Sequence, residues 1–323
     1  MVTHDRTLRV VAPGVQATVQ DFGRRDVARY GLSPSGAADW FSAAAANLLV
    51  GNASAAALIE TTLTGASFEM RSAARIALTG ARASLTIDDM LAAQWCAHDI
   101  RAGATIELSA AQAGARSYLA VDGGVVVPLV FDSAATDLGA ALGGFGGRAL
   151  RAGDEIVLGA PRARDTSALV SCQIEAPQWE SAVTLRLLPG PHRASIAQTA
   201  WQTLFDRTWG VSSRSTRQGV QLDGEPLPLA GPTDVISAGA YAGCVQVTSA
   251  GIPVVLLTEH QTTGGYATVA CTIAADVWRA GQLRPGDRVR FAEISRVEAA
   301  RVLRERMALL SKLVKGHSEG PVR

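Results

Sequence analysis

Apolar and polar residues alternate along most of this chain, in short runs separated by glycine-rich turns. Alternation over about four to eight residues is the pattern of a half-buried β-strand, and such turns connect consecutive strands. Helical spacing of apolar residues is confined to a few segments. The sequence therefore predicts a mostly β fold with a few short helices and one helix near the C-terminus.

The segments with helical spacing are few, and each has a recognisable start or end. One predicted helix begins near Ser33–Gly36, continues through an Ala-rich run and ends at Gly51, which suits the C′ position. A second helix is expected near residues 193–204 and a short one near 274–280. The last covers 294–314 and has a basic excess. That helix either forms a docking face or covers the second domain.

One short pattern recurs along the chain. It reads "IRAGATIEL" at 100–108, "LRAGDEIVL" at 150–158 and "LRPGDRVRF" at 283–291. Each copy is typical of a tight turn that leads into a half-buried strand. Similar segments precede two of the copies, "YLAVDGG" at 118–124 and "CVQVTSAG" at 244–251. The repeat predicts two related β-rich domains in tandem.

The 323 residues are enough for two domains with separate cores. We expect a first domain over 1–165 and a second over 183–293. The residues between them, 166–182, are predicted to be a linker, because the surrounding sequence is mixed in pattern and contains prolines. Residues 294–323 form the C-terminal helix and tail.

Composition and charge exclude several classes of protein. Hydrophobic residues make up 48% of the chain and charged residues 18%, which is typical of a folded globular protein. The formal net charge of +1 argues against nucleic acid as a partner. The N-terminus has no apolar signal core, and the apolar stretch 41–59 is interrupted by Asn47 and Asn52. We therefore expect no membrane partner and a cytoplasmic location.

Lysine is nearly absent, since only Lys312 and Lys315 occur. The body of the protein therefore has no lysine nucleophile and no phosphate-binding P-loop. The cysteines show no C-x-x-C spacing, and the histidines form no ligand pair at helical spacing. We expect no metal site and reduced cysteines in apolar surroundings. These are Cys96, Cys172, Cys244 and Cys271.

A first polar cluster follows a predicted strand near residue 20. Asp21 and Arg24 either form an ion pair or hold a substrate by both signs of charge, and Gln20 lies beside them. Ser35 and Asp39 precede or open the Ala-rich helix, whose N-terminus suits an anion. A capped helix and a turn are the structural alternative.

Three further motifs allow a functional and a structural interpretation. Glu60 ends an apolar run, where a partly desolvated carboxylate suits a general base, although a solvated strand end is the commoner outcome. The glycine-rich segment 143–150 leads into a strand, so it does not fit a dinucleotide fingerprint, which requires a helix. Arg214 and Arg217 lie among hydroxyl residues and form either an oxyanion clamp or a solvated loop.

The segment "TEHQTTGGY", Thr258–Tyr266, places many polar groups between two apolar runs. It contains no activated nucleophile, the chain has no G-x-S-x-G elbow, and the missing lysine excludes a Ser–Ser–Lys amidase. The segment therefore indicates binding and polarisation of a small polar acid or amide. The groups that it offers are the side chains of Gln261, Thr262, Thr263 and Tyr266 and the backbone of Gly264 and Gly265.

Taken together, these motifs resemble a known family. "TVQDFGR", "GLSPSGAAD", "SYLAVDGG", "GGRALRAGD", "STRQGVQLDG" and "QTTGGY" occur in the order found in the allophanate hydrolase subunit 2 family. This family is also known as the C subunit of 5-oxoprolinase, as KipI antagonist, or as biotin-dependent carboxyltransferase-like. The motifs extend over residues 18–291, nearly the whole chain.

The resemblance implies two tandem cyclophilin-like β-barrel domains and a role in a hetero-oligomer. The implied partners are a smaller cyclophilin-like protein, which is the KipI-like B subunit of 5-oxoprolinase, and the A subunit of the same enzyme. Together they would form an ATP-dependent 5-oxoprolinase, which opens the lactam of 5-oxo-L-proline to L-glutamate. ATP would act at the level of the complex.

Residue chemistry together with motif position predicts roles for individual residues. Asp21, Glu60 or Glu259 would be the base, and Arg24 and Arg217 would meet carboxylate or phosphate charge. Two departures from the family pattern are Glu259, where Asp is usual, and Ala267, where Pro is usual. The predicted substrate-binding residues are Gln20, Arg24, Ser35, Arg217, Gln246, Gln261, Thr262, Thr263, Gly264, Gly265 and Tyr266.

Two other functions fit the same resemblance. One is a carboxyltransferase half that binds biotin and urea or another amide. It would need a biotin-carrying partner, because Lys312 and Lys315 have no carrier-domain context. The other is a non-catalytic protein that binds the smaller, KipI-like partner and stops it from inhibiting a sensor kinase.

Overall fold

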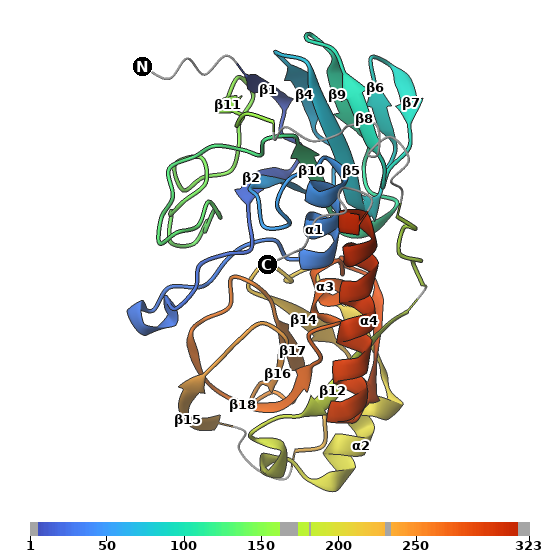
Figure 1. The fold of residues 1–323 in the computed structure, drawn as a ribbon. Coiled ribbons are helices and arrows are strands. Elements are labelled where there is room, and N and C mark those ends of the chain that lie inside the picture. The colour runs from blue at the N-terminus through green and yellow to red at the C-terminus, as the bar shows by residue number, and fades with distance from the viewer. Residues whose placement is uncertain (1–5, 162–173, 181, 230–233, 316–323) are drawn as a thin grey trace. The chain divides into compact units, whose positions relative to one another are not determined.

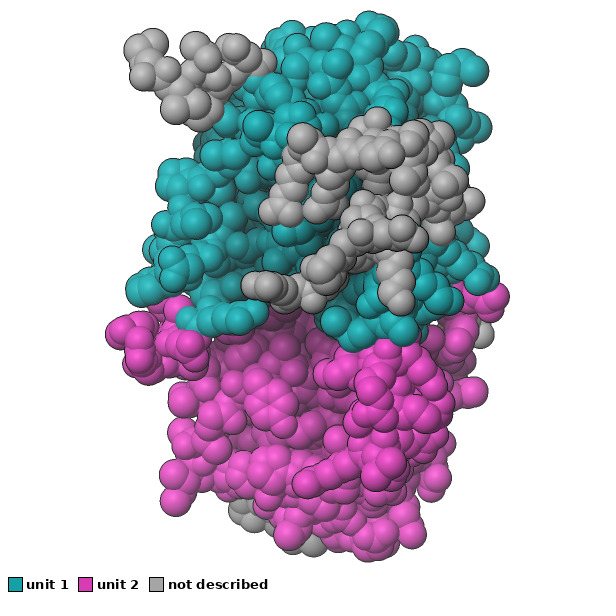
Figure 2. Space-filling view, in the orientation of Figure 1, with its two compact units in different colours: residues 1–25, 40–177, 306–323 teal, residues 26–39, 178–305 magenta. Residues whose placement is uncertain are grey.

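The computed structural model describes residues 6–161, 174–180, 182–229 and 234–315. The chain divides into two compact units, shown in different colours in Figure 2. Unit 1 consists of residues 1–25, 40–177 and 306–323, and unit 2 of residues 26–39 and 178–305. Most of the predicted linker, and with it Cys172, lies outside the described residues.

Unit 1 contains two antiparallel sheets (Figure 1). In spatial order, the first is β11 (Glu155–Val157), β1 (Thr7–Ala12), β4 (Ser67–Met70), β9 (Thr105–Leu108), β6 (Leu85–Ile87) and β7 (Met90–Ala92). The second is β2 (Gln16–Gln20), β3 (Leu58–Thr62), β10 (Ala113–Val121), β5 (Ala74–Arg82) and β8 (Ala97–Ile100).

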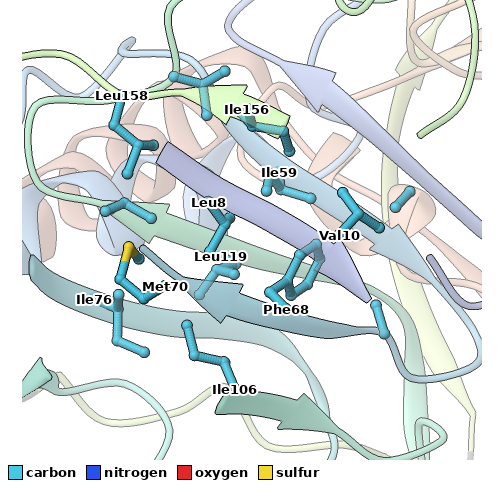
Figure 3. Close-up of a cluster of buried hydrophobic side chains, with 14 of the residues drawn as sticks. Leu8, Val10, Ile59, Phe68, Met70, Ile76, Ile106, Leu119, Ile156 and Leu158 are labelled. Carbon is cyan, nitrogen blue, oxygen red and sulfur yellow. The ribbon is translucent and has the colours of Figure 1, made fainter. Parts of the chain in front are cut away.

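The two sheets share one apolar core, drawn in Figure 3. In β1, Leu8 and Val10 are fully buried whereas Arg9 between them is exposed, as expected for a strand with one face on the core. In β10 every residue after the first is buried, because α1 (Trp40–Leu49) packs on the sheet at β5 and β10. Thr79 Oγ1 of β5 donates to the carbonyl of Ser42 in this helix at 2.7 Å.

The Ala-rich helix ends as predicted but begins later than predicted. Gly51 has φ +82°, the left-handed conformation of a C′ glycine, so this part of the prediction is confirmed. The predicted start near residues 33–36 is wrong, because α1 begins at Trp40. Ser35 and Gly36 have φ of +54° and +92°, which no right-handed helix accommodates.

Unit 2 is built around a closed β-barrel with seven strands. In order around the barrel these are β12 (Val183–Pro189), β19 (Arg288–Glu293), β13 (Thr208–Val211), β14 (Gly219–Asp223), β17 (Pro253–Leu256), β16 (Cys244–Val247) and β18 (Thr263–Thr272). The barrel closes because β18 also pairs with β12, and β15 (Asp234–Gly239) adds to β18 at one side. Full closure leaves no open sheet edge within the barrel.

The remaining helices are few and mostly short. They are η1 (Ala28–Tyr30), η3 (Arg193–Ser195), α2 (Gln198–Asp206), α3 (Val277–Gly281) and α4 (Arg296–Lys315). The prediction of a mostly β fold with a few short helices and a C-terminal helix is confirmed, and the barrel of unit 2 agrees with tandem barrel domains. Among the residues described, no helix has both the length and the apolar character that a membrane span requires.

The recurring turn has the same geometry in all three copies. Gly103, Gly153 and Gly286 have φ between +77° and +90°, and each lies two residues before a strand. The N–H of each glycine donates to a carbonyl elsewhere in the same unit, those of Met70, Val10 and Val211 respectively. Glycine is required here because a side chain strains this conformation. The prediction that the motif is a turn leading into a strand is confirmed.

Candidate functional site

Three neighbouring strands of unit 2 place polar residues on the outer face of the barrel. Val220, Val255 and Val245 lie side by side on β14, β17 and β16, and all are buried in the barrel core. Because side chains alternate across a strand, the next residue on each strand points to the opposite face. The neighbouring residues that point to the outer face are Gln221 on β14, Val254 on β17 and Gln246 on β16, and Val254 is paired with both glutamines.

This outer face forms the floor of a pocket of about 360 Å³. Ile252, Val254 and Leu256 provide an apolar strip, since they are alternate residues in and beside β17. The polar lining comes from loops and strands on both sides of the strip. It consists of Arg214, Thr216, Gln218, Gln221, Gln246, Thr248, Gln261 and Tyr266.

Gln246 is the most enclosed of the polar lining residues. It is 3% exposed, yet its carboxamide makes no hydrogen bond to any protein group that the structure describes. Buried polar groups in proteins are normally hydrogen-bonded, so an open carboxamide at a pocket is a candidate ligand contact. Its carboxamide atoms are not fully enclosed by protein, and Gln246 lines the pocket.

Gly264 on β18 leaves room for two of these carboxamides. A Cβ at this position would lie 2.9 Å from Nε2 of Gln261 and 3.1 Å from Nε2 of Gln246. Gly264 therefore has a packing reason on the pocket side. Gly265 faces the carbonyl of Val235 instead.

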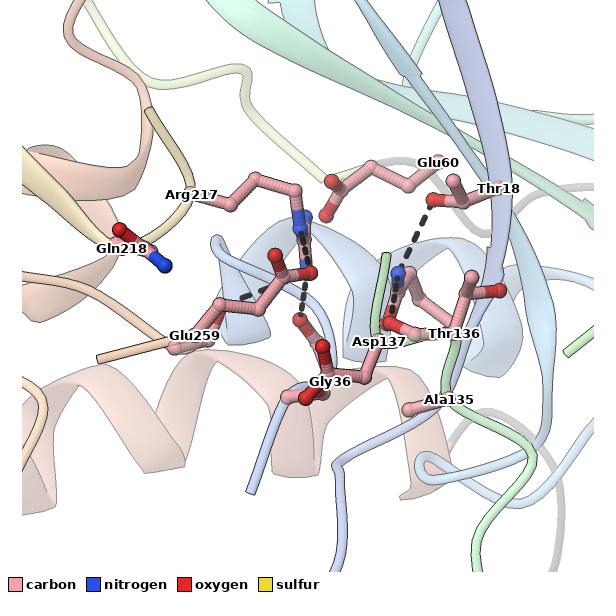
Figure 4. Close-up of polar contacts among 12 residues, drawn as sticks. Thr18, Gly36, Glu60, Ala135, Thr136, Asp137, Arg217, Gln218 and Glu259 are labelled. Carbon is pink, nitrogen blue, oxygen red and sulfur yellow. Dashed lines mark hydrogen bonds and ion pairs between the residues drawn. The ribbon is translucent and has the colours of Figure 1, made fainter. Parts of the chain in front are cut away.

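Arg217 lies between two pocket-lining residues in the sequence, Thr216 and Gln218, but it does not line the pocket. Its guanidinium forms hydrogen bonds with other groups of unit 2. Its Nε donates to Oε1 of Glu259 at 2.6 Å and its Nη2 to the carbonyl of Gly36 at 2.6 Å. Figure 4 shows the guanidinium of Arg217 beside the carboxylate of Glu259, with the backbone of Gly36 close to both. The side chains of Arg217 and Glu259 are only 6% and 9% exposed. The guanidinium thus holds the strand-connecting segment at Glu259 against the segment at Gly36.

The segment from Ser35 to Asp39 packs inside unit 2, which explains why it does not extend α1. The N–H of Ser35 donates to the carbonyl of Thr258 at 3.0 Å, and the hydroxyl of Ser35 contacts that of Ser33 at 3.1 Å. Asp39 is fully buried and accepts from Nε2 of Gln282 at 2.8 Å.

His260 fixes the backbone beside the pocket. Its Nδ1 lies 2.8 Å from the carbonyl of Gln261, and the ring is 5% exposed. Burial lowers the pKa of His260 below its ordinary value, because the charged imidazolium loses its hydration. The imidazole is therefore neutral at pH 7, and its Nδ1–H donates to that carbonyl.

In unit 1, the side chains of Gln20 and Asp21 form hydrogen bonds with other groups of the same unit. Nε2 of Gln20 donates to Thr18 Oγ1 at 3.0 Å and to the carbonyl of Thr136 at 3.2 Å. Asp21 accepts three hydrogen bonds of 2.7 Å, from the N–H groups of Gly23 and Ala134 and the hydroxyl of Ser133. Oε1 of Gln20 is buried without a hydrogen-bond partner among the described residues.

Arg24 and Glu60 are also buried in unit 1. Nη2 of Arg24 donates to the carbonyl of Ala135. Glu60 lies in the middle of β3 rather than at its end, is 1% exposed, and accepts from the hydroxyl of Tyr118 at 2.8 Å. Nε of Arg116 lies 3.6 Å from its other oxygen. Glu60 was expected at a strand end, either in solvent or partly desolvated. The structure instead encloses its carboxylate within the sheet.

Among the predicted substrate-binding residues, the structure brings Gln246, Gln261 and Tyr266 together around the pocket. Thr263 pairs with Gly239 at the start of β18. Thr262 precedes this strand, and its carbonyl accepts from the N–H of Ala240 at 2.9 Å. The roles predicted for these residues stay predictions.

Sequence reasoning missed several lining residues, which are Thr216, Gln218, Gln221 and Thr248. The available signal was the alternation in "RQGVQLD", which places Gln221 opposite the core residue Val220. The sequence marks Arg214 as one half of a clamp with Arg217, and in the structure Arg214 lines the pocket without Arg217.

The structure gives no site for a metal in the part of the chain that it describes, since no group of three or more His, Cys, Asp or Glu side chains is suitably placed. Cys96, Cys244 and Cys271 are free thiols. Cys244 and Cys271 lie opposite each other on β16 and β18.

Comparison with known proteins gives a consistent result. Residues 30–293 match the family described as "Carboxyltransferase domain, subdomain A and B". The chain is 34% identical to the C subunit of 5-oxoprolinase from Escherichia coli (strain K12), over 95% of this chain and 97% of that protein. It is 32% identical to the C subunit of 5-oxoprolinase from Haemophilus influenzae, over 92% of this chain and 94% of that protein.

A solved structure extends this comparison to the fold. The crystal structure of the K. lactis urea amidolyase matches 97% of this chain with a TM-score of 0.87 and 27% identity. This chain corresponds to 20% of the length of that protein. Together the matches confirm the family resemblance that the sequence motifs indicate.

Proposed function

This chain belongs to the family of the carboxyltransferase domain, subdomain A and B, and from that premise we propose that it is the larger cyclophilin-like subunit of a 5-oxoprolinase. The complex would use ATP to hydrolyse 5-oxo-L-proline to L-glutamate in the cytoplasm. The observation that carries the proposal is the match to the C subunit of 5-oxoprolinase over nearly the full length of both proteins. Its partners would be the A and B subunits of the same enzyme.

The chemistry explains why such a complex would need ATP. The lactam carbon of 5-oxoproline is unreactive because the amide is resonance-stabilised. Phosphorylation of the amide oxygen would make the carbon electrophilic, so that water can add to it. The ring would then open by cleavage of the C–N bond with a proton going to the nitrogen, and hydrolysis of the remaining acyl phosphate would release glutamate and inorganic phosphate. The residues of this chain would then have to hold the ring and direct water, which agrees with a site without a nucleophilic side chain.

The pocket of unit 2 is the place where this chain would hold the substrate. Gln246 and Gln261 offer both donors and acceptors to an amide, and Tyr266 offers a ring face with a polar tip. A volume of about 360 Å³ lies in the range of small-molecule sites. Arg24 and Arg217 are bonded to protein carbonyls or carboxylate in this structure, so charge recognition by them would need a rearrangement.

Asp21, Glu60 and Glu259 are the candidate bases. Replacing each by its amide, Asp21→Asn, Glu60→Gln and Glu259→Gln, keeps the size and removes the basic oxygen. Replacing the residue that activates water should lower kcat about 100-fold with little change in KM. Replacing a residue that only supports the fold should lower the temperature of unfolding instead.

The decisive experiment is reconstitution. We expect the chain, co-expressed with the A and B subunits, to release glutamate from 5-oxo-L-proline only when ATP is present. Omitting this chain from the mixture is the control and should abolish the release. A complete complex that forms but releases no glutamate with ATP would contradict the proposal.

A carboxyltransferase role is the second candidate, favoured by the fold match to urea amidolyase. A carboxamide-lined pocket also suits a ureido group, which has the same planar N–H and C=O edges as a lactam. The test is transfer of a carboxyl group from a carboxybiotin-bearing partner to urea. Transfer in the absence of any lactam hydrolysis would favour this candidate.

A further inference from the structure

Four glutamine side chains are gathered on one pocket of unit 2, namely Gln218, Gln221, Gln246 and Gln261. None of their carboxamides makes a hydrogen bond to a protein group within the described part of the chain. Each carboxamide offers two donor hydrogens and one acceptor oxygen in a plane. Gln218 and Gln261 are exposed and Gln221 is half-buried, whereas Gln246 is buried, and a buried carboxamide without a protein partner is uncommon because buried polar groups are normally hydrogen-bonded.

Arg214 adds a cation to the rim of this pocket. Its side chain is 69% exposed, with Nη2 3.6 Å from a carboxylate oxygen of Asp223 and Nε 3.4 Å from the hydroxyl of Ser212. Both contacts are long, and exposed ion pairs of this kind are weak. The guanidinium can therefore turn to a carboxylate in the pocket, unlike that of Arg217, which is held by Glu259 at 2.6 Å.

Charge sets a limit on what the pocket accepts. Among the described residues that line it, Arg214 is the only charged one, and the others are amides, hydroxyls, a phenol and apolar groups. This lining matches a mostly neutral molecule with a single negative charge. It does not match a nucleoside triphosphate, whose several negative charges call for several cations or a metal ion.

We propose that this pocket selects a small molecule with one planar amide group and one carboxylate, which rests on the proposed 5-oxoprolinase role and assigns its recognition groups. Gln221 and Gln246 bond to the N–H and C=O edge of the amide. Arg214 binds the carboxylate. The apolar strip of Ile252 and Val254 contacts the ring methylenes, and nucleotide binds elsewhere in the complex.

Gly264 makes the amide side of the pocket possible. A Cβ here would press on the amide nitrogens of Gln261 and Gln246, which are the ends of flexible side chains. Gly264→Ala therefore displaces the carboxamides without blocking the backbone, since the glycine is not in a left-handed conformation. This variant probes the pocket independently of the glutamines themselves.

Three probes separate the two halves of the recognition. They are 5-oxo-L-proline, 2-pyrrolidinone, which lacks the carboxylate, and 5-oxotetrahydrofuran-2-carboxylate, which has an ester in place of the amide N–H. Their dissociation constants are measured by calorimetric titration of the reconstituted complex without ATP. 5-Oxo-L-proline should bind at least about tenfold more tightly than either of the others.

The variants should remove this preference one half at a time. Arg214→Ala should weaken 5-oxo-L-proline about tenfold and leave 2-pyrrolidinone unchanged, whereas Gln246→Leu and Gly264→Ala should weaken both amides. Gln202→Leu and Arg288→Ala, at exposed positions away from the pocket, are the matched controls. Circular dichroism and the temperature of unfolding check that each variant is folded.

The outcomes distinguish the pocket from the reaction. Glutamate release with an unchanged KM in both Arg214→Ala and Gln246→Leu would overturn the pocket assignment and leave the 5-oxoprolinase role standing. The predicted order of binding without any ATP-dependent glutamate release would remove that role and support the assignment. Equal binding of the three probes, or none, would overturn the assignment.

Discussion

The polar cluster around Asp21 in unit 1 and the pocket of unit 2 contain similar side chains but use their hydrogen bonds differently. Asp21 accepts three short hydrogen bonds from groups of its own unit. At the pocket, Gln246 is enclosed, yet its carboxamide bonds to no described protein group. The first cluster stabilises a loop, and the second leaves hydrogen-bonding capacity for a ligand.

The same contrast separates two arginines that lie three positions apart. Arg217 is buried and bonded to Glu259 and Gly36, whereas Arg214 is exposed at the pocket rim with long contacts only. A buried charge without a partner is costly, and an exposed one is not. The contrast between the two arginines shows that burial alone does not mark a binding residue. A buried polar side chain is a candidate ligand contact only when the protein does not already supply its hydrogen-bond partners.

The largest effect is expected for Arg217→Ala. Removing this guanidinium takes away the ion pair with the Glu259 side chain, which is 9% exposed, and should lower the free energy of unfolding by about 3–5 kcal/mol. Arg214→Ala should change it by no more than about 0.5 kcal/mol. Urea unfolding of the full chain measures both. Equal stability of the two variants would contradict the distinction between the arginines.

A smaller loss of stability is expected for Asp21→Ala. The variant leaves the N–H groups of Gly23 and Ala134 without their acceptor, at a cost of about 2–3 kcal/mol. Asp21→Asn should lose less, because its carbonyl oxygen still accepts. The same urea titration provides the measurement. An unchanged midpoint for Asp21→Ala would show that the loop does not depend on these bonds.

Gln246→Leu should have the opposite profile, with little effect on the fold and a large effect on binding. No protein partner is left unsatisfied by the change, so the free energy of unfolding should stay within about 0.5 kcal/mol. Affinity for 5-oxo-L-proline should fall about tenfold. A large loss of stability would mean that the carboxamide supports the barrel rather than a ligand.

The smallest effect is expected from pH. Because burial lowers the pKa of His260 below 6.5, the unfolded chain binds a proton at a pH where the folded chain does not. Stability should therefore be complete above pH 6.5 and decrease as the pH falls below it. His260→Gln should remove this part of the pH dependence of the urea midpoint. An identical slope in the variant would show that other groups cause it.

The fold was predictable where local chemistry determines it. The turns at Gly103, Gly153 and Gly286 follow from the need for glycine in a left-handed conformation. The end of α1 at Gly51 follows for the same reason. The start of α1 was not predictable, because Ser35–Asp39 is held by contacts with distant residues of unit 2 rather than by its own helical propensity.

The site was predictable only in part, for a similar reason. Gln261 and Tyr266, which line the candidate pocket, were singled out from the sequence because they belong to a conspicuous polar segment between apolar runs. Gln218 and Gln221 were missed, because their place at the pocket depends on which face of β14 is outside the barrel. The sequence alone did not distinguish Arg214 from Arg217, since pairing with Glu259 depends on the fold.

The most direct test of a substrate pocket in unit 2 is the steady-state rate of ATP-dependent glutamate release by the reconstituted complex. Gln246→Leu is compared with Gln202→Leu over a range of 5-oxo-L-proline concentrations. We predict that Gln202→Leu behaves as the unaltered protein and that Gln246→Leu raises KM at least about tenfold while remaining folded. Indistinguishable KM and kcat values for the two variants would contradict the account.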